Sequence, residues 1–169
     1  MSAKIYGFIP ARWGSTRFPG KPLHVIAGKP LLQHVWERCQ ACSELARVVV
    51  ATDDERIAEA ARAFGAEVAM TRSDHPSGSD RIAEAVEQYP DCTHAVNVQG
   101  DEPMIDPELV DELARTLRDQ ELPMVTAANR LENDEDIGNP NIVKVVLNKS
   151  GQALYFSRSV IPHGRNRHP

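Results

Sequence analysis

Short apolar runs alternate with amphipathic segments along most of this chain of 169 residues. Residues 46–52 (ARVVVAT) are rich in β-branched residues, as is typical of a strand buried on both faces, and residues 54–64 then carry apolar side chains at helical spacing. The same order recurs, with strands expected at residues 4–10, 67–70 and 94–98 and helices at 30–42, 79–89 and 107–120. Strands that alternate with helices of this length predict an α/β fold with a Rossmann-like, mostly parallel sheet flanked by helices.

Composition indicates one folded domain over residues 1–169, since 41% hydrophobic and 25% charged residues are typical of a globular chain. Later strands are expected at 124–129, 142–147 and 153–157, and the acidic run at 132–136 is expected to be a solvated loop.

Cys39 and Cys42 lie late in an amphipathic helix without a second cysteine pair, which favours core packing over a metal or redox site. No signal sequence or membrane-spanning run is visible, which favours a cytoplasmic location without a membrane partner.

The charges are unevenly distributed along the chain. The formal net charge is −5, yet no acidic residue occurs before Glu37. The cations of this first part are Lys4, Arg12, Arg17, Lys21 and Lys29. A basic block in an acidic chain fits a polyanionic small molecule better than nucleic acid, which needs a wider basic face.

The loop after the first expected strand, IPARWGSTRFPGKPL at residues 9–23, combines small residues with cations. It is not a Walker A loop, because five residues rather than four separate Gly14 from Gly20 and Pro22 follows Lys21 where a hydroxyl is needed. Two interpretations remain: a loop whose backbone N–H groups, Arg12 and Lys21 bind phosphate, or a solvated basic loop. The sequence leaves open whether Trp13 shields phosphates or is simply exposed.

Two further stretches follow expected strands. In HPSGSDR at residues 75–81, Ser77 and Gly78 begin a helix whose first N–H groups point outward. In NVQGDEP at residues 97–103, Gln99 and Asp101 lie in a turn. Because ligands bind beyond the carboxyl ends of parallel strands, the three stretches are expected to meet at one edge of the sheet. Cations, N–H groups and a carboxylate together suit a nucleoside triphosphate with Mg²⁺.

The chain resembles the 3-deoxy-manno-octulosonate cytidylyltransferase (CMP-Kdo synthetase) family, a branch of the nucleotide-diphospho-sugar transferase type. The motifs that carry the resemblance are IPARWGSTRFPGKPL, ATDDERI, HPSGSDRIAEA, VNVQGDEP, VKVV and ALYFSRSVIP, in this order. The resemblance implies that CTP and Kdo react to CMP-Kdo and pyrophosphate for lipopolysaccharide biosynthesis. It also implies Mg²⁺ as cofactor and a homodimer.

The resemblance implies roles for particular residues. Arg12 and Lys21 are expected to hold the triphosphate with help from Ser15, and these two cations with Asp101 form the catalytic set. Asp101 is also the expected metal ligand. The remaining assignments are a cytidine pocket lined by Pro10, Ala11, Ser77 and Gly78, Gln99 between nucleotide and sugar, and Arg158 facing the sugar acid.

Family members continue well beyond residue 169, so we expect a nucleotide-binding domain that lacks the part completing the sugar site and the dimer contact. Two other functions stay open: a transferase for another sugar, such as a sialic acid cytidylyltransferase, and a nucleotide-binding regulatory module without catalysis. A dinucleotide-dependent oxidoreductase is disfavoured, because no G-x-G-x-x-G follows the first expected strand.

Overall fold

The computed structural model describes residues 3–14 and 18–162. Contacts between residues divide the chain into two compact units, Met1–Val125 and Thr126–Pro169, where the sequence predicts one domain. The division falls within a stretch without helix or strand that begins after residue 119 and extends to residue 133.

The first unit contains a four-stranded sheet in the order β5-β4-β1-β6, and every neighbouring pair is parallel. The strands are β1 (Ile5–Ala11), β4 (Arg47–Thr52), β5 (Glu67–Met70) and β6 (His94–Asn97). In β1, which lies between β4 and β6, Phe8 is paired with Val49 of β4 and with Asn97 of β6. The prediction of a mostly parallel α/β sheet is confirmed.

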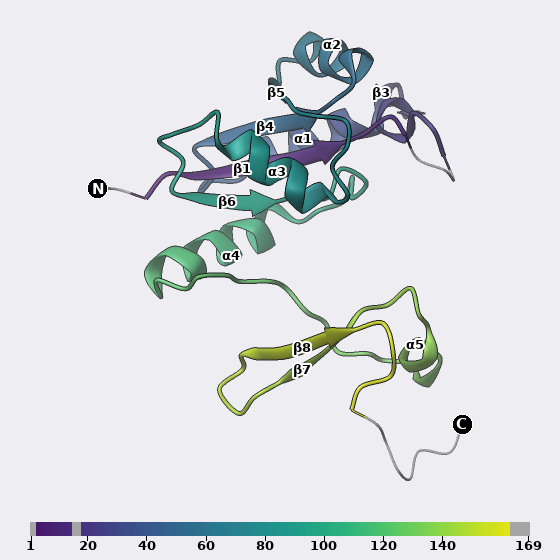
Figure 1. Ribbon diagram of the computed structural model, residues 1–169, viewed down its shortest axis with the longest axis vertical. Coiled ribbons are helices and arrows are strands. Elements are labelled where there is room, and N and C mark those ends of the chain that lie inside the picture. Colours follow the sequence, from purple (N-terminus) through teal and green to yellow (C-terminus); the bar gives the residue numbers. More distant parts are fainter. Residues whose placement is uncertain (1–2, 15–17, 163–169) are drawn as a thin grey trace. The chain divides into compact units, whose positions relative to one another are not determined.

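Helices cover both faces of this sheet because β1 and β4 bury side chains on both sides. The helices are α1 (Leu31–Gln40), α2 (Glu55–Ala63), α3 (Gly78–Val86) and α4 (Pro107–Asp119). Ile9 and Val50 pack with apolar residues of α1 and α2, whereas Phe8 and Val49 pack with Ile82 of α3 on the other face. Figure 1 shows α3 in front of the sheet and α1 behind it.

The two cysteines of the C-x-x-C segment are part of the packed interior. Cys39 and Cys42 are buried and form no disulfide. Burial raises the pKa of the Cys39 thiol to about 12 and that of Cys42 to about 11. Both thiols are therefore protonated at neutral pH and unreactive, as the prediction of core packing requires.

A short hairpin follows β1 that the sequence does not predict. A 3-10 turn η1 (Lys21–Leu23) leads into β2 (Val25–Ile26) and β3 (Lys29–Pro30), which are antiparallel. Ala27 and Gly28 between these strands both have positive φ, as a tight hairpin turn requires. Strands of two residues are too short to produce a readable alternation of apolar and polar positions.

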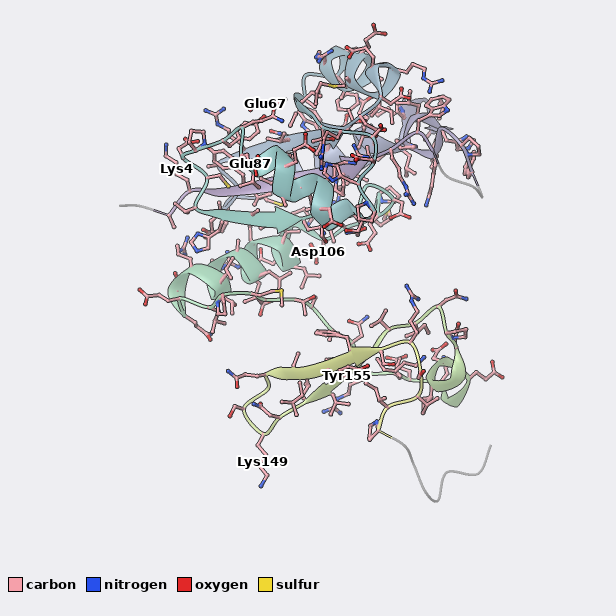
Figure 2. The ribbon with its side chains drawn as sticks, in the orientation of Figure 1. Lys4, Glu67, Glu87, Asp106, Lys149 and Tyr155 are labelled. Atoms are coloured by element: carbon pink, nitrogen blue, oxygen red, sulfur yellow. The ribbon has the colours of Figure 1, made fainter. Side chains whose placement is uncertain are left out.

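The second unit contains α5 (Asp134–Gly138) and an antiparallel pair, β7 (Lys144–Leu147) and β8 (Ala153–Ser157). Figure 2 labels Tyr155 on β8 and Lys149 in the turn between the two strands. Lys144 is buried, and its ammonium donates to the carbonyls of Asn139, Ile142 and Arg158. These bonds link the ends of the hairpin to the segment after α5.

Two expectations about this part of the chain are wrong. Residues 124–129 form no strand, since no neighbouring segment pairs with their backbone and Met124 is 77% exposed. The acidic run at 132–136 is partly helical, because α5 begins within it.

Asp111 of α4 gives the first unit a buried carboxylate whose ionisation contributes to stability. It accepts hydrogen bonds from Ser43 N (2.8 Å), Ser43 Oγ (2.7 Å) and Glu44 N (2.9 Å). Burial by itself raises the pKa of Asp111, but these bonds outweigh burial, and the pKa lies below its ordinary value. The stabilisation is therefore present above the pKa of an unfolded aspartate and is lost as the pH falls through the folded value.

Asp111→Asn should therefore lower the free energy of unfolding at pH 7 by about 1–3 kcal/mol, the value of hydrogen bonds to a charged group. The difference from the wild type should shrink as the pH falls below 4, which urea titrations across pH would measure. Asp119→Asn is the control, because Asp119 forms an exposed ion pair with Arg118 on the same helix. Equal losses in both variants at pH 7 would contradict the role of Asp111.

Candidate active site

Three chain segments meet beyond the carboxyl ends of the parallel strands and enclose a pocket of about 610 Å³. Figure 1 shows β1 and β6 pointing toward this same edge of the sheet. The lining residues are Pro10, Ala11, Arg12, Phe18, Lys21, Pro22, His75, Pro76, Ser77, Gly78, Arg81, Gln99, Gly100 and Asp101. The loop after β1, the segment before α3 and the turn after β6 thus form one site, as their places after strands predict.

Lys21 and Asp101 are in direct contact in this pocket. Lys21 Nζ lies 2.6 Å from Asp101 Oδ2, and both side chains are partly exposed. Gly100 makes the approach possible, because a Cβ at this position would lie 2.9 Å from the carbonyl oxygen of Pro10. The turn after β6 can therefore pack directly on the end of β1, which brings Asp101 to the basic loop.

The start of α3 is closed by a capping box. Ser77 Oγ accepts a hydrogen bond from Asp80 N (3.2 Å) and donates one to Asp80 Oδ2 (2.5 Å). The hydroxyl of Ser77 is thus used within the cap, and the Asp80 carboxylate adds negative charge to the helix N-terminus. Asp80 thus contributes negative charge beside Ser77, whereas Arg12 and Lys21 contribute positive charge to the pocket.

The chain matches a family model described as cytidylyltransferase over residues 6–169. It belongs to the cytidylyltransferase family. The 3-deoxy-manno-octulosonate cytidylyltransferase of Histophilus somni (strain 2336) is 52% identical over 161 residues, which are 94% of this chain and 62% of that protein. The enzyme of the same name from Pseudomonas syringae pv. tomato is 52% identical over 169 residues, which are 98% of this chain and 66% of that protein.

Among solved structures, one of CMP:2-keto-3-deoxy-manno-octonic acid synthetase complexed with CTP is 45% identical with a TM-score of 0.86. The match covers 97% of this chain and 68% of that chain. The family resemblance and the fold type are confirmed. This cytidylyltransferase chain spans about two thirds of the length of the curated relatives named above, 62% and 66%.

Arg81 is a pocket residue that the sequence does not predict. It is 3% exposed, and its guanidinium donates to Thr71 Oγ1 (2.6 Å) and to the carbonyl of Arg72 (3.3 Å). Nη1 also lies 2.9 Å from Asp53 Oδ1, which makes an ion pair rather than a directed hydrogen bond. Arg81 therefore joins α3 to the ends of β4 and β5. In the sequence, Arg81 stands one turn into a helix and has apolar neighbours. An arginine at such a position is usually interpreted as facing the solvent.

Replacing Arg81 with methionine should lower the free energy of unfolding by about 3 kcal/mol, because Asp53 would be left mostly buried without its cation. Urea titration measures this loss, and the double variant Arg81→Met/Asp53→Leu should recover much of it. Arg62→Met is the control, since Arg62 forms an exposed ion pair with Glu55. A loss for Arg81→Met no larger than that of the control would contradict the structural role of the buried pair.

His75 and Glu84 form a second pair that orders the segment before α3. The side chain of His75 is 6% exposed, and its Nε2 contacts Glu84 Oε2. The backbone N–H of Arg72 donates to the same carboxylate. The hydrogen bond from His75 is the main reason that the pKa of Glu84 lies below its ordinary value. Glu84 thus fixes the segment that carries Ser77 into the pocket.

Not every predicted site residue lies in the pocket that the structure describes. Ser15 falls outside the described residues. Arg158 belongs to the second unit, where its guanidinium donates to the carbonyls of Pro140 (2.9 Å) and Asn141 (3.2 Å). Gln99 lines the pocket, and its amide donates to Asn97 Oδ1 (2.9 Å). The roles of Gln99 and Arg158 toward a sugar remain predictions.

Within residues 3–14 and 18–162, no three histidine, cysteine, aspartate or glutamate side chains come together as a metal site of protein ligands alone would require. Asp101 is thus the pocket carboxylate available to a cation, and it already faces the Lys21 ammonium. A metal that binds here needs most of its ligands from elsewhere.

In the part of the chain that the structure describes, no helix has the length and apolar character needed to cross a bilayer.

Proposed function

We propose that this cytidylyltransferase transfers the cytidylyl group of CTP to 3-deoxy-D-manno-octulosonate (Kdo) and releases pyrophosphate. The product, CMP-Kdo, would serve lipopolysaccharide biosynthesis. The observation that carries the proposal is that Arg12, Lys21 and Asp101 line one pocket in a chain 45% identical to a synthetase complexed with CTP. Relatives that are 52% identical and named 3-deoxy-manno-octulosonate cytidylyltransferase support Kdo as the sugar.

The distribution of charge supports one orientation of CTP in the pocket. Arg12 and Lys21 would hold the triphosphate, because charge-assisted hydrogen bonds to phosphate are the strongest that these side chains make. The base would lie near Ser77 and Gly78, where the Asp80 carboxylate disfavours phosphate. Pro10 and Ala11 would complete the cytidine pocket, and Ser15 would assist at the phosphates.

Mg²⁺ is part of the proposal, with Asp101 as its protein ligand. Mg²⁺ usually takes one or two carboxylates, adds phosphate oxygens and keeps several waters, so a single carboxylate beside a triphosphate fits it. Bound there, Mg²⁺ would neutralise charge on the phosphates and lower the pKa of the attacking hydroxyl. Lys21 would then separate from Asp101 and turn its ammonium toward the triphosphate.

The residues would act by positioning and by charge. The anomeric hydroxyl oxygen of Kdo forms a bond to the α-phosphorus of CTP and gives up its proton to solvent, while the bond from phosphorus to the bridging oxygen breaks and pyrophosphate leaves with the electron pair. Arg12 and Lys21 would stabilise the negative charge that grows on the leaving group. Gln99 would hold the sugar in line with the α-phosphorus, and Arg158 would bind its carboxylate. This route needs no covalent enzyme intermediate.

A homodimer and a cytoplasmic location belong to the same proposal. We expect the homodimer from the family resemblance and the cytoplasmic location from the sequence.

The test is a panel of sugar acids offered to the full chain with CTP and Mg²⁺, with pyrophosphate release as the readout. Release with Kdo and not with sialic acid is the expected result. Release with sialic acid alone would assign the other sugar. Binding of CTP without release with any sugar acid would contradict catalysis and would fit a regulatory module.

A further inference from the structure

The loop between Arg12 and Lys21 is closed at its base by a backbone contact. Gly20 N donates a hydrogen bond of 3.0 Å to the carbonyl of Trp13, which brings these two residues together. We call the pair of Trp13 and Gly20 the loop neck. Arg12 and Lys21 directly flank the neck, which explains how two cations nine positions apart line the same pocket.

The side chain of Trp13 packs on the backbone of Gly20. Gly20 has φ of 70°, and a Cβ on it would lie 2.9 Å from the indole ring of Trp13. The ring also packs against the apolar cluster beneath α1 and α2. Trp13 thus fills the neck of the loop and is absent from the residues that line the pocket. Of the two interpretations left open by the sequence, a simply exposed side chain is wrong, because Trp13 is partly buried against this cluster.

Arg56 holds the same indole from α2. Its guanidinium carbon lies 3.5 Å from the centroid of the Trp13 ring, a close cation–π contact. The guanidinium is itself fixed, because Nε donates to Asp54 Oδ1 (2.9 Å) and Nη2 donates to Asp54 Oδ2 (2.6 Å). Asp54 is the N-cap of α2 and accepts a hydrogen bond from the backbone N–H of Arg56 (3.0 Å). The indole is therefore attached to the end of β4 through a rigid, planar pair.

We infer that Trp13 and Arg56 are positioning residues for the nucleotide site, which hold the loop neck so that Arg12 and Lys21 keep the spacing a triphosphate requires. The inference rests on the proposed function, because it assigns the two cations to CTP. Neither Trp13 nor Arg56 lines the pocket, so they act through the neck. A fixed neck lowers the entropy that CTP binding must otherwise remove from the loop.

The test compares three arginine variants by titration of CTP in the presence of Mg²⁺. Arg56→Ala should weaken CTP binding by about 3- to 10-fold, in line with the loss of a cation–π contact and of preorganisation. Arg62→Ala is the matched control, since it removes the same charge from the same helix at a similar exposure, 50% against 58%. Arg56→Lys keeps the charge but loses the planar, bidentate contact with Asp54, so it should behave like Arg56→Ala.

Fluorescence gives a second readout that does not depend on CTP. The chain contains two tryptophans, so Trp36→Phe leaves Trp13 as the single reporter. Quenching of Trp13 by acrylamide should increase when Arg56→Ala is added to this background and stay the same with Arg62→Ala.

The outcomes separate the inference from the function it rests on. Wild-type binding of CTP with equal affinity in Arg56→Ala and Arg62→Ala would overturn the inference and leave the proposed function in place. The same holds if Arg56→Lys binds CTP as the wild type does, since charge alone would then suffice. Absence of CTP binding in the wild type would overturn the proposed function and, with it, the role assigned to the neck.

Discussion

Replacing Lys21 with alanine should reduce kcat/KM for CTP by about 100- to 1,000-fold, the usual cost of removing one group that stabilises charge in a transition state. Lys21 is the cation paired with Asp101 in the pocket, and the proposed role places its ammonium on the triphosphate. The fold should persist, because the ion pair is partly exposed and such pairs contribute about 0–1 kcal/mol. Pyrophosphate release and a urea titration on the same preparation would measure both quantities.

Lys29→Ala provides the control for Lys21. Lys29 also follows β1, and its ammonium lies 2.8 Å from Glu37 in a pair of similar exposure, but it does not line the pocket. It should leave kcat/KM within about 2-fold of the wild type, as expected for a screened surface charge. If Lys21→Ala retained activity as high as Lys29→Ala, Lys21 would have no role in the reaction.

Asp101→Asn should separate the binding of CTP from its dependence on Mg²⁺. Turnover at saturating Mg²⁺ should fall by about 100-fold or more, because the protein ligand of the metal is lost. Binding of CTP without Mg²⁺ should stay equal or become tighter. The variant frees Lys21 from its 2.6 Å pair and removes a carboxylate that repels the triphosphate. Calorimetric titration of CTP with and without Mg²⁺ would measure both effects.

Asp91→Asn is the matching control, since Asp91 is an exposed carboxylate paired with Lys4 and does not line the pocket. Its Mg²⁺ dependence should equal that of the wild type. An unchanged Mg²⁺ titration for Asp101→Asn would remove Asp101 from the metal site, and weaker CTP binding without Mg²⁺ would show that its pair with Lys21 supports the nucleotide.

The alternation of strands and helices made the first unit predictable from the sequence. Buried parallel strands such as β4 are continuously apolar, and the helices between them carry one apolar face, so both leave strong periodic signals. The site followed from the same pattern, because parallel topology places every strand-end loop at one edge. Arg12, Lys21 and Asp101 could be grouped for that reason alone.

What the sequence could not predict depends on contacts between distant residues. Arg81 is an arginine whose partners, Asp53 and Thr71, come from two other strand ends, and nothing local distinguishes it from a solvent-facing side chain. The contact of Trp13 with Arg56 likewise joins the loop after β1 to α2. The strand expected at 124–129 failed because β structure needs a pairing partner as well as suitable side chains.

A crystal structure of the full chain with CTP and Mg²⁺ would test most directly whether this pocket binds the nucleotide. The triphosphate should lie against Arg12 and Lys21 with the base beside Ser77 and Gly78, and Lys21 Nζ should have moved beyond 4 Å, the limit of an ion pair, from Asp101. CTP bound at another place, or bound here with the contact between Lys21 and Asp101 unchanged, would contradict the account.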